Sequence, residues 1–194
     1  MSHYRKIDVR IWNDAKFSSL PTTGKLGFFL MLTHPSMTAL GAMRGTPAGL
    51  VAELEGFRDG FAEGNGEGFR DGFAEVFAKG MAEFDQTGRL IALPNFVKYN
   101  PPTAPNVVKS WVNALEYLPE CELKAVVVQR AVAFAEGMGK GFRDAIPQAL
   151  RDAMRYPLSI EHRAYPIHGG KVSELATTGG RGARLAVVNG EDEL

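Results

Sequence analysis

The side chains best suited to chemistry in this sequence are cations in a stretch that has no acids. Residues 88 to 110 contain Arg89, Lys98 and Lys109 but no aspartate or glutamate, and a tyrosine and an asparagine directly follow Lys98. Guanidinium and ammonium groups bind phosphate oxygens, and nearby carboxylates weaken that contact. The stretch therefore predicts a phosphate contact. The alternative is an ordinary solvated surface, where most lysines and arginines lie.

Other cations lie in less favourable surroundings. Arg70 and Lys79 belong to a predicted helix whose polar face also carries three carboxylates, those of Glu67, Asp71 and Glu75. Because carboxylates repel phosphate, this helix is a poor reader of a DNA groove unless its two cations alone point at the duplex. Arg44 lies just before another predicted helix. The N-terminal arm carries three further cations, Arg5, Lys6 and Arg10, and one acid, Asp8.

The sequence carries no enzyme or metal signature. It contains no GxxxxGK[ST] phosphate loop, no GxSxG nucleophile motif and no HExxH motif. Its four histidines have no metal-ligand spacing with the single cysteine, Cys121. Asp59 and Asp71 each follow an arginine, a pattern typical of a solvated surface rather than of an acid–base pair. We therefore expect no catalytic residue, no metal and no cofactor.

Composition limits the class of protein. Among 194 residues, 45% are hydrophobic, which is enough for one compact domain and a small second one. The 22 basic and 22 acidic residues balance, so any nucleic-acid surface must be local. One cysteine cannot form a disulfide within the chain, and no apolar run reaches the roughly 18 residues of a membrane span. A cytoplasmic protein that neither enters nor crosses a membrane is expected.

The predicted elements have to position these cations. Apolar periodicity first predicts a helix after Pro21 that stops at His34, and then a short strand at 39–43. Two further helices are predicted, one opened by Thr46 and Pro47 and one capped by Gly80. Two strands follow at 81–84 and 90–93, joined by the turn at 85–88. Helix, strand, helix, helix, strand, strand is the order of a winged helix.

A segment is repeated in tandem, and its second copy lies in the third predicted helix. EGFRDGFAE occurs at 55–63 and again at 67–75, separated by Gly-Asn-Gly. Glycines disfavour one continuous helix through both copies, at about 1 kcal/mol each. In the second copy Phe69 and Phe73, with Phe77 beyond it, lie four residues apart on one helix face, which indicates core packing. The second copy is therefore predicted to be the working helix.

The remainder of the chain is predicted to be helical and then irregular. Trp111 lies in an amphipathic stretch at 107–118, and a second helix follows at 122–135. A weaker amphipathic piece at 142–154 should be kinked or restarted by Pro147. Because large aromatic side chains more often fill a core than bind a ligand, we expect Trp12 and Trp111 to be core residues. The predicted organisation is a winged-helix domain at 1–98, a helical region at 99–154 and a flexible, glycine-rich tail at 155–194.

Three segments carry a resemblance to a known family. They are YRKIDVRIWNDAKFSSL (4–20), GKLGFFLMLTHP (24–35) and GRLIALPNFVKYNPPTAPNVVKSWVNALEYLPECELK (88–124). The chain resembles the winged-helix replication proteins of bacteriophages and prophages, called replisome organisers or replication initiators. The resemblance implies a mainly α fold with a small β-hairpin, a winged helix-turn-helix followed by a short helical region and a disordered tail. It also implies binding to duplex or single-stranded DNA, recruitment of a helicase or helicase loader, and no enzymatic activity.

Two features depart from that family. Its members carry one helix where this chain repeats EGFRDGFAE, so a 12-residue tandem duplication that leaves residues 56–67 as a looped insertion is the simplest explanation. The tail at 155–194 differs from the tails of the family and receives no role.

The resemblance and the charge pattern together predict a DNA-binding set. In a winged helix the third helix enters the major groove and the wing contacts a neighbouring phosphate or the minor groove. The residues expected to bind DNA are Arg44, Arg70, Lys79, Arg89, Lys98 and Lys109. Two alternatives stay open: an adaptor that docks a basic partner through the acidic face of 55–75, and a prophage transcription regulator.

Overall fold

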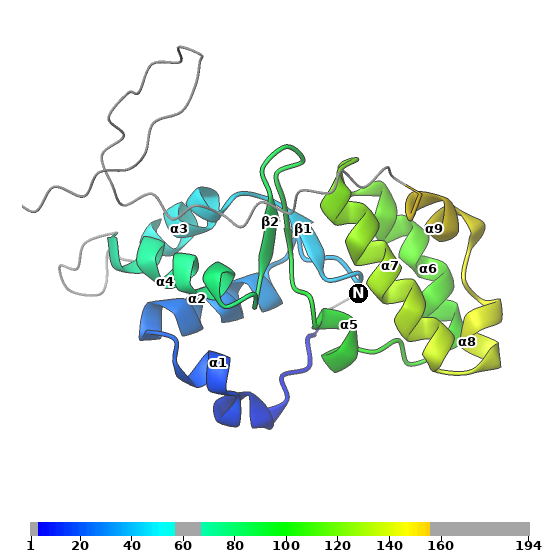
Figure 1. The fold of residues 1–194 in the computed structure, drawn as a ribbon, viewed down its shortest axis with the longest axis horizontal. Helices are drawn as coiled ribbons and strands as arrows, with labels where there is room; N and C mark the ends of the chain where they lie inside the picture. Colours follow the sequence, from blue (N-terminus) through cyan, green and yellow to red (C-terminus); the bar gives the residue numbers. More distant parts are fainter. Residues whose placement is uncertain (1–3, 57–66, 156–194) are drawn as a thin grey trace, which may run out of the picture.

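The computed structural model describes residues 4–56 and 67–155, and it is mainly helical with a small three-stranded antiparallel sheet (Figure 1). The first part contains a 3-10 helix, η1 (Val9–Asn13), followed by α1 (Ala15–Ser18), α2 (Thr22–Thr33), β1 (Ala42–Arg44), α3 (Pro47–Gly56) and α4 (Glu67–Ala78). The second part contains β2 (Glu83–Asp85), β3 (Leu90–Ala92), α5 (Phe96–Tyr99), α6 (Pro105–Glu116), α7 (Glu122–Gly137), α8 (Lys140–Asp144) and α9 (Gln148–Ala153). The expected mainly α composition is confirmed.

The sheet has one strand more than the predicted hairpin. Strands β2 and β3 form the hairpin, and β1 pairs with the other edge of β3, so the order is β1-β3-β2. The predicted strand at 39–43 begins later, because Thr38 to Gly41 form a turn closed by the Gly41 amide donating to the Thr38 carbonyl at 3.1 Å. Gly41 has φ +78°, and a Cβ there would lie 2.3 Å from Cβ of Phe96, so only glycine fits.

The helix of the second repeat copy is confirmed. It is α4, which ends at Ala78, and Gly80 with φ +64° follows as the predicted capping glycine. The Gly80 amide donates to the Phe77 carbonyl at 2.9 Å and the Met81 amide donates to the Val76 carbonyl at 3.1 Å. These two bonds form a Schellman cap, which turns the chain directly into the hairpin. The prediction that the first copy is a looped insertion concerns residues that lie mostly outside the described part of the chain.

Helices α2 and α4 cross at two glycines. A Cβ on Gly72 would lie 2.5 Å from the Gly24 amide nitrogen, and one on Gly24 would lie 2.9 Å from the Gly72 carbonyl oxygen. The backbones can therefore approach only because both side chains are missing. Beside the crossing, Phe73 is 1% exposed, and Phe69 and Phe77 pack against the core as partly buried residues. The predicted core role of this phenylalanine stripe is confirmed.

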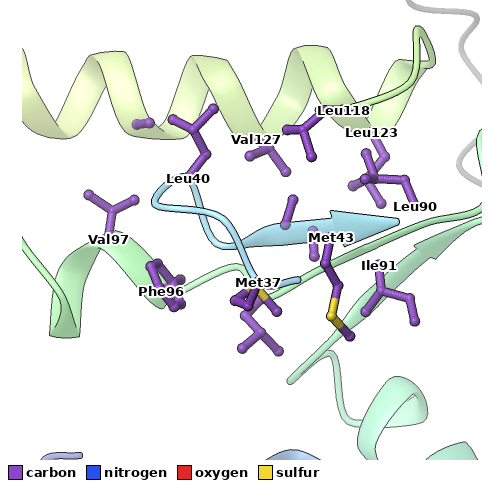
Figure 2. Close-up of a cluster of buried hydrophobic side chains, with 14 of the residues drawn as sticks. Met37, Leu40, Met43, Leu90, Ile91, Phe96, Val97, Leu118, Leu123 and Val127 are labelled. Atoms are coloured by element: carbon purple, nitrogen blue, oxygen red, sulfur yellow. The ribbon is translucent and has the colours of Figure 1, made fainter. Parts of the chain in front are cut away.

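Helices α6 to α9 cover the side of the sheet opposite α2, α3 and α4 (Figure 1). Helix α7 packs across β2 and β3, and Figure 2 shows Leu90 of β3 pointing towards Leu118, Leu123 and Val127. Strand β3 is consequently buried throughout. The chain restarts a helix after Pro147, as predicted.

One hydrophobic cluster runs through both parts of the described chain, so the regions predicted at 1–98 and 99–154 share their core. The boundary predicted after residue 98 stays a prediction, and the tail at 156–194 lies outside the description. No helix within residues 4–56 and 67–155 is long and apolar enough to span a bilayer.

The two tryptophans behave differently. Trp111 is 1% exposed and confirmed as a core residue. The same prediction for Trp12 is wrong, because that side chain is 61% exposed on η1. Phe17 already fills the core position beneath it, and the Trp12 ring meets Phe17 edge-on with 5.4 Å between centroids.

Candidate nucleic-acid interface

The structure brings Arg44 and Arg89 together at the tip of the sheet. Arg44 ends β1 opposite Leu90, and the next amide, that of Gly45, donates to the Arg89 carbonyl at 2.8 Å. Both arginine side chains are exposed. Two cations that are far apart in sequence therefore adjoin on neighbouring strands, beside the hairpin turn.

The hairpin turn is held in one conformation. The Asp85 carboxylate accepts a hydrogen bond from the Gly88 amide at 2.6 Å. A Cβ on Gly88 would lie 2.7 Å from Sγ of Cys121, so the turn fits closely against the loop before α7. Arg89 follows with φ +49°, in the left-handed region that non-glycine residues seldom adopt. The backbone that carries the Arg89 guanidinium is thus fixed before any ligand arrives.

A salt bridge from α7 stabilises the other edge of the hairpin. Arg130 donates to both carboxylate oxygens of Glu83 on β2, at 2.6 and 2.9 Å. A bidentate guanidinium–carboxylate pair fixes orientation as well as distance. Since β3 is enclosed between β1 and β2 and covered by α7, the exposed part of this wing-like hairpin is its turn rather than its strands.

The outer face of α4 carries charges of both signs. Arg70 and Asp71 are exposed and adjacent, and Lys79 forms an ion pair with Glu75 at 3.3 Å. The mixed charge expected for this helix is therefore present in the structure. Here the cations have carboxylate neighbours on their own helix, which lowers the attraction of the face for phosphate.

Lys98 and Lys109 do not join Arg89. Lys98 lies on α5, a single helical turn that was not predicted from the sequence. Helix α5 follows the C-terminal end of β3, whereas Arg89 precedes its N-terminal end. Lys109 is exposed on α6. The acid-free stretch is thus continuous in sequence but divided in space among the sheet tip, α5 and α6.

Lys98 instead lines a groove that no sequence pattern predicts. The groove has a volume of about 510 Å³ and lies between the N-terminal arm with η1 on one side and α5 on the other. Four cations line it: Lys6, Arg10, Lys16 and Lys98. The basic arm residues are visible in the sequence, but their approach to α5 depends on the fold.

Two carboxylates, Asp8 and Asp14, also line the groove, and each has a partner. Asp8 accepts from the Arg10 guanidinium at 2.6 Å, and this hydrogen bond holds the pKa of Asp8 at about 2. Asp14 caps α1 by accepting from the Phe17 amide at 2.9 Å. Both carboxylates therefore have hydrogen-bond donors close to them in the chain.

Within the described ranges, no three histidine, cysteine, aspartate or glutamate side chains gather as a metal site. The single cysteine, Cys121, is buried, and desolvation raises the pKa of its thiol. Comparisons with protein-family models, curated proteins and solved structures found no match for this chain.

Proposed function

We propose that this protein is a non-enzymatic, cytoplasmic replication protein of phage or prophage origin that binds DNA through a winged helix. The support for the fold is the succession α2, β1, α3, α4, β2, β3, with β1 added to the hairpin, which is the arrangement a winged helix requires. The support for the pathway is the resemblance of residues 4–124 to winged-helix replication proteins.

The observation that carries the proposal is the pair of exposed arginines at the tip of the sheet, Arg44 at the end of β1 and Arg89 in the rigid hairpin turn. A tip of this kind suits the phosphate backbone, because arginine binds phosphate oxygens bidentately and the fixed turn lowers the entropy lost on binding. Such contacts position a protein on DNA without reading its sequence.

On this proposal α4 contributes less than the third helix of a typical winged helix. Its exposed Arg70 lies beside Asp71, and Lys79 is already paired with Glu75. The affinity would then come mainly from the sheet tip. Recruitment of a helicase or helicase loader by the helices after Pro105 is supported by the resemblance alone.

The test is fluorescence anisotropy with a labelled duplex at several salt concentrations. Replacing both tip arginines (Arg44→Ala with Arg89→Ala) should weaken binding. It should also make the slope of log K against log salt shallower by about 0.9 for each phosphate that the variant no longer neutralises. The control is Lys140→Ala with Arg143→Ala on α8, which removes the same charge from another exposed surface.

Absence of duplex binding at low salt would contradict the proposal, and so would equally weakened binding in the tip and control variants. If a pull-down recovers a partner protein even after nuclease treatment, and the protein has no affinity for DNA, the protein is an adaptor instead. If the protein does bind duplex DNA, footprinting separates a replication role from transcription control by locating the bound site beside an origin or within a promoter.

A further inference from the structure

The groove beside α5 has the size of a ligand site. Its volume of about 510 Å³ lies inside the range of about 300–1,000 Å³ typical of such sites. Phe28 and Leu32 of α2 line it, as do Met81 and Leu93 from the segments flanking the hairpin. In Figure 1 the N-terminal arm, in blue, runs from beside α5 to α1. The arm and α5 thus form two walls over an apolar base.

The charge of the groove favours an anion. In the part of the chain that the structure describes, no carboxylate forms an ion pair with Lys6, Lys16 or Lys98. All three lysines are exposed. The two carboxylates are engaged with Arg10 and with the start of α1, so three ammonium groups remain for a ligand.

An aromatic ring adjoins one of these ammonium groups. Tyr99 lines the groove and is 41% exposed, and Lys98 Nζ lies 5.3 Å from the centroid of its ring. A nucleobase stacked on Tyr99 would place its own phosphate within reach of a lysine. Rings on which bases stack, together with cations that follow the backbone, are how proteins hold single strands.

The groove is formed in advance of binding. Asn100 accepts from the Lys6 amide at 2.8 Å and donates to the Lys6 carbonyl at 3.4 Å. The Arg5 guanidinium lies 5.2 Å from the centroid of the Phe96 ring and donates to the Met37 carbonyl. These contacts hold the arm against α5 and the core, so little ordering remains to oppose a ligand.

We propose that this groove binds single-stranded nucleic acid, with Tyr99 stacking on a base and Lys98, Lys6 and Lys16 contacting phosphates. A duplex keeps the faces of its bases stacked inside the helix, whereas a single strand can present an unstacked base to an aromatic ring. The inference does not depend on the winged-helix proposal, because it uses none of the residues of the sheet tip.

The test measures anisotropy of labelled 15-residue oligothymidylate and oligouridylate, at a length of roughly one site for a single-strand-binding module, with the full chain. Tyr99→Ala should weaken binding of the preferred strand on the order of tenfold. Lys98→Ala should weaken binding and make the salt dependence shallower by about 0.7 in log–log slope. Binding of either oligonucleotide that depends on both residues supports the inference.

Matched controls come from outside the groove. Tyr117, at the end of α6, is 71% exposed, and Lys140 is exposed on α8, so Tyr117→Ala and Lys140→Ala make the same chemical changes elsewhere. Both should bind the single strands as the unaltered protein does. Thermal unfolding of every variant checks that the fold is intact.

The inference is overturned if neither oligonucleotide binds at low salt, or if folded Tyr99→Ala and Lys98→Ala variants bind no more weakly than their controls. Replacing Arg44 and Arg89 should leave single-strand binding unchanged while weakening duplex binding. A protein that binds single strands but no duplex would therefore count against the proposed function and not against this groove.

Discussion

The outer face of α4 and the tip of the sheet both present exposed arginines, yet they differ in what surrounds the charge. On α4, carboxylates lie one residue from Arg70 and four residues from Lys79. At the sheet tip, Arg44 at the end of β1 adjoins Arg89, which lies in a turn where the carboxylate of Asp85 accepts from the backbone. The placement of acids, rather than the number of cations, therefore separates a phosphate-binding surface from a solvated one.

The inner face of α4 makes the contrast sharper. That face packs against α2 through the glycine crossing and Phe73, so the part of α4 that contributes most to stability is buried and cannot contact a ligand. The sheet tip has the opposite balance, because its exposed side chains add little to the core. Substitutions on the two regions should therefore separate stability from binding.

The largest effect is expected at the helix crossing. Gly72→Ala would place a Cβ 2.5 Å from a backbone nitrogen of α2, and neither helix can move without disturbing the core. We expect the free energy of unfolding, measured by denaturant titration, to fall by about 2–4 kcal/mol. The control is Gly68→Ala on the exposed side of the same helix, which should raise stability by up to about 1 kcal/mol. Equal stabilities for the two variants would show that the crossing is loose.

A smaller effect is expected for the cations on the outer face of α4, the exposed Arg70 and the half-buried Lys79. Arg70→Ala with Lys79→Ala should weaken duplex binding less than about threefold, whereas the tip double variant should weaken it by about tenfold or more, a difference near 1 kcal/mol. Anisotropy at one low salt concentration suffices for this comparison. A larger effect from the α4 pair would assign the DNA-groove contact to α4 and reverse the contrast.

Deletion of residues 56–67 should change the stability of the protein much less than Gly72→Ala does. The core contacts of α4 come from Gly72, Phe73 and Val76, all of which remain, while Glu55 replaces Glu67 in the surviving copy of the repeat. We expect a cooperative thermal transition within about 4 °C of the full chain, measured by circular dichroism. Disappearance of that transition would mean that the first copy packs into the fold.

The smallest effect concerns the strained residue of the hairpin turn. Arg89→Gly should raise the free energy of unfolding by up to about 1 kcal/mol, because glycine adopts φ +49° without steric cost. The same variant should weaken duplex binding by removing a tip cation. Arg89→Lys, which keeps the charge and the strain, serves as the control. If Arg89→Gly is less stable than Arg89→Lys, contacts of the guanidinium outweigh the strain.

Features with local signals were predictable from sequence. Pro47 after a capping threonine starts α3, the Thr46 hydroxyl accepts from the Gly49 amide at 3.1 Å, and Gly80 ends α4. The turn at 85–88 located the hairpin, and the phenylalanine spacing located the buried face of α4. Each of these signals depends on residues within one or two helical turns of each other, so neighbours in the chain suffice to specify it.

Features that depend on contacts between distant parts of the chain were not predictable from the sequence. Nothing near Ala42–Arg44 shows that this strand pairs with β3, and no local pattern marks Phe96–Tyr99 as a helical turn. The exposure of Trp12 was missed for a different reason, because Phe17, five residues later, occupies the core position instead. In each case the local sequence does not show which partner a residue meets in the folded protein.

The sequence by itself determined the order of the elements, the acid-free run of cations and the glycines that permit close turns. Only the tertiary structure decided how those cations are grouped: Arg89 with Arg44 at the sheet tip, and Lys98 with the N-terminal arm. The groove shows why most clearly, because the hydrogen bonds that close it join Lys6 and Asn100, 94 positions apart. Backbone propensity acts over a few residues, whereas side chains from distant segments meet only after the core has brought their elements together.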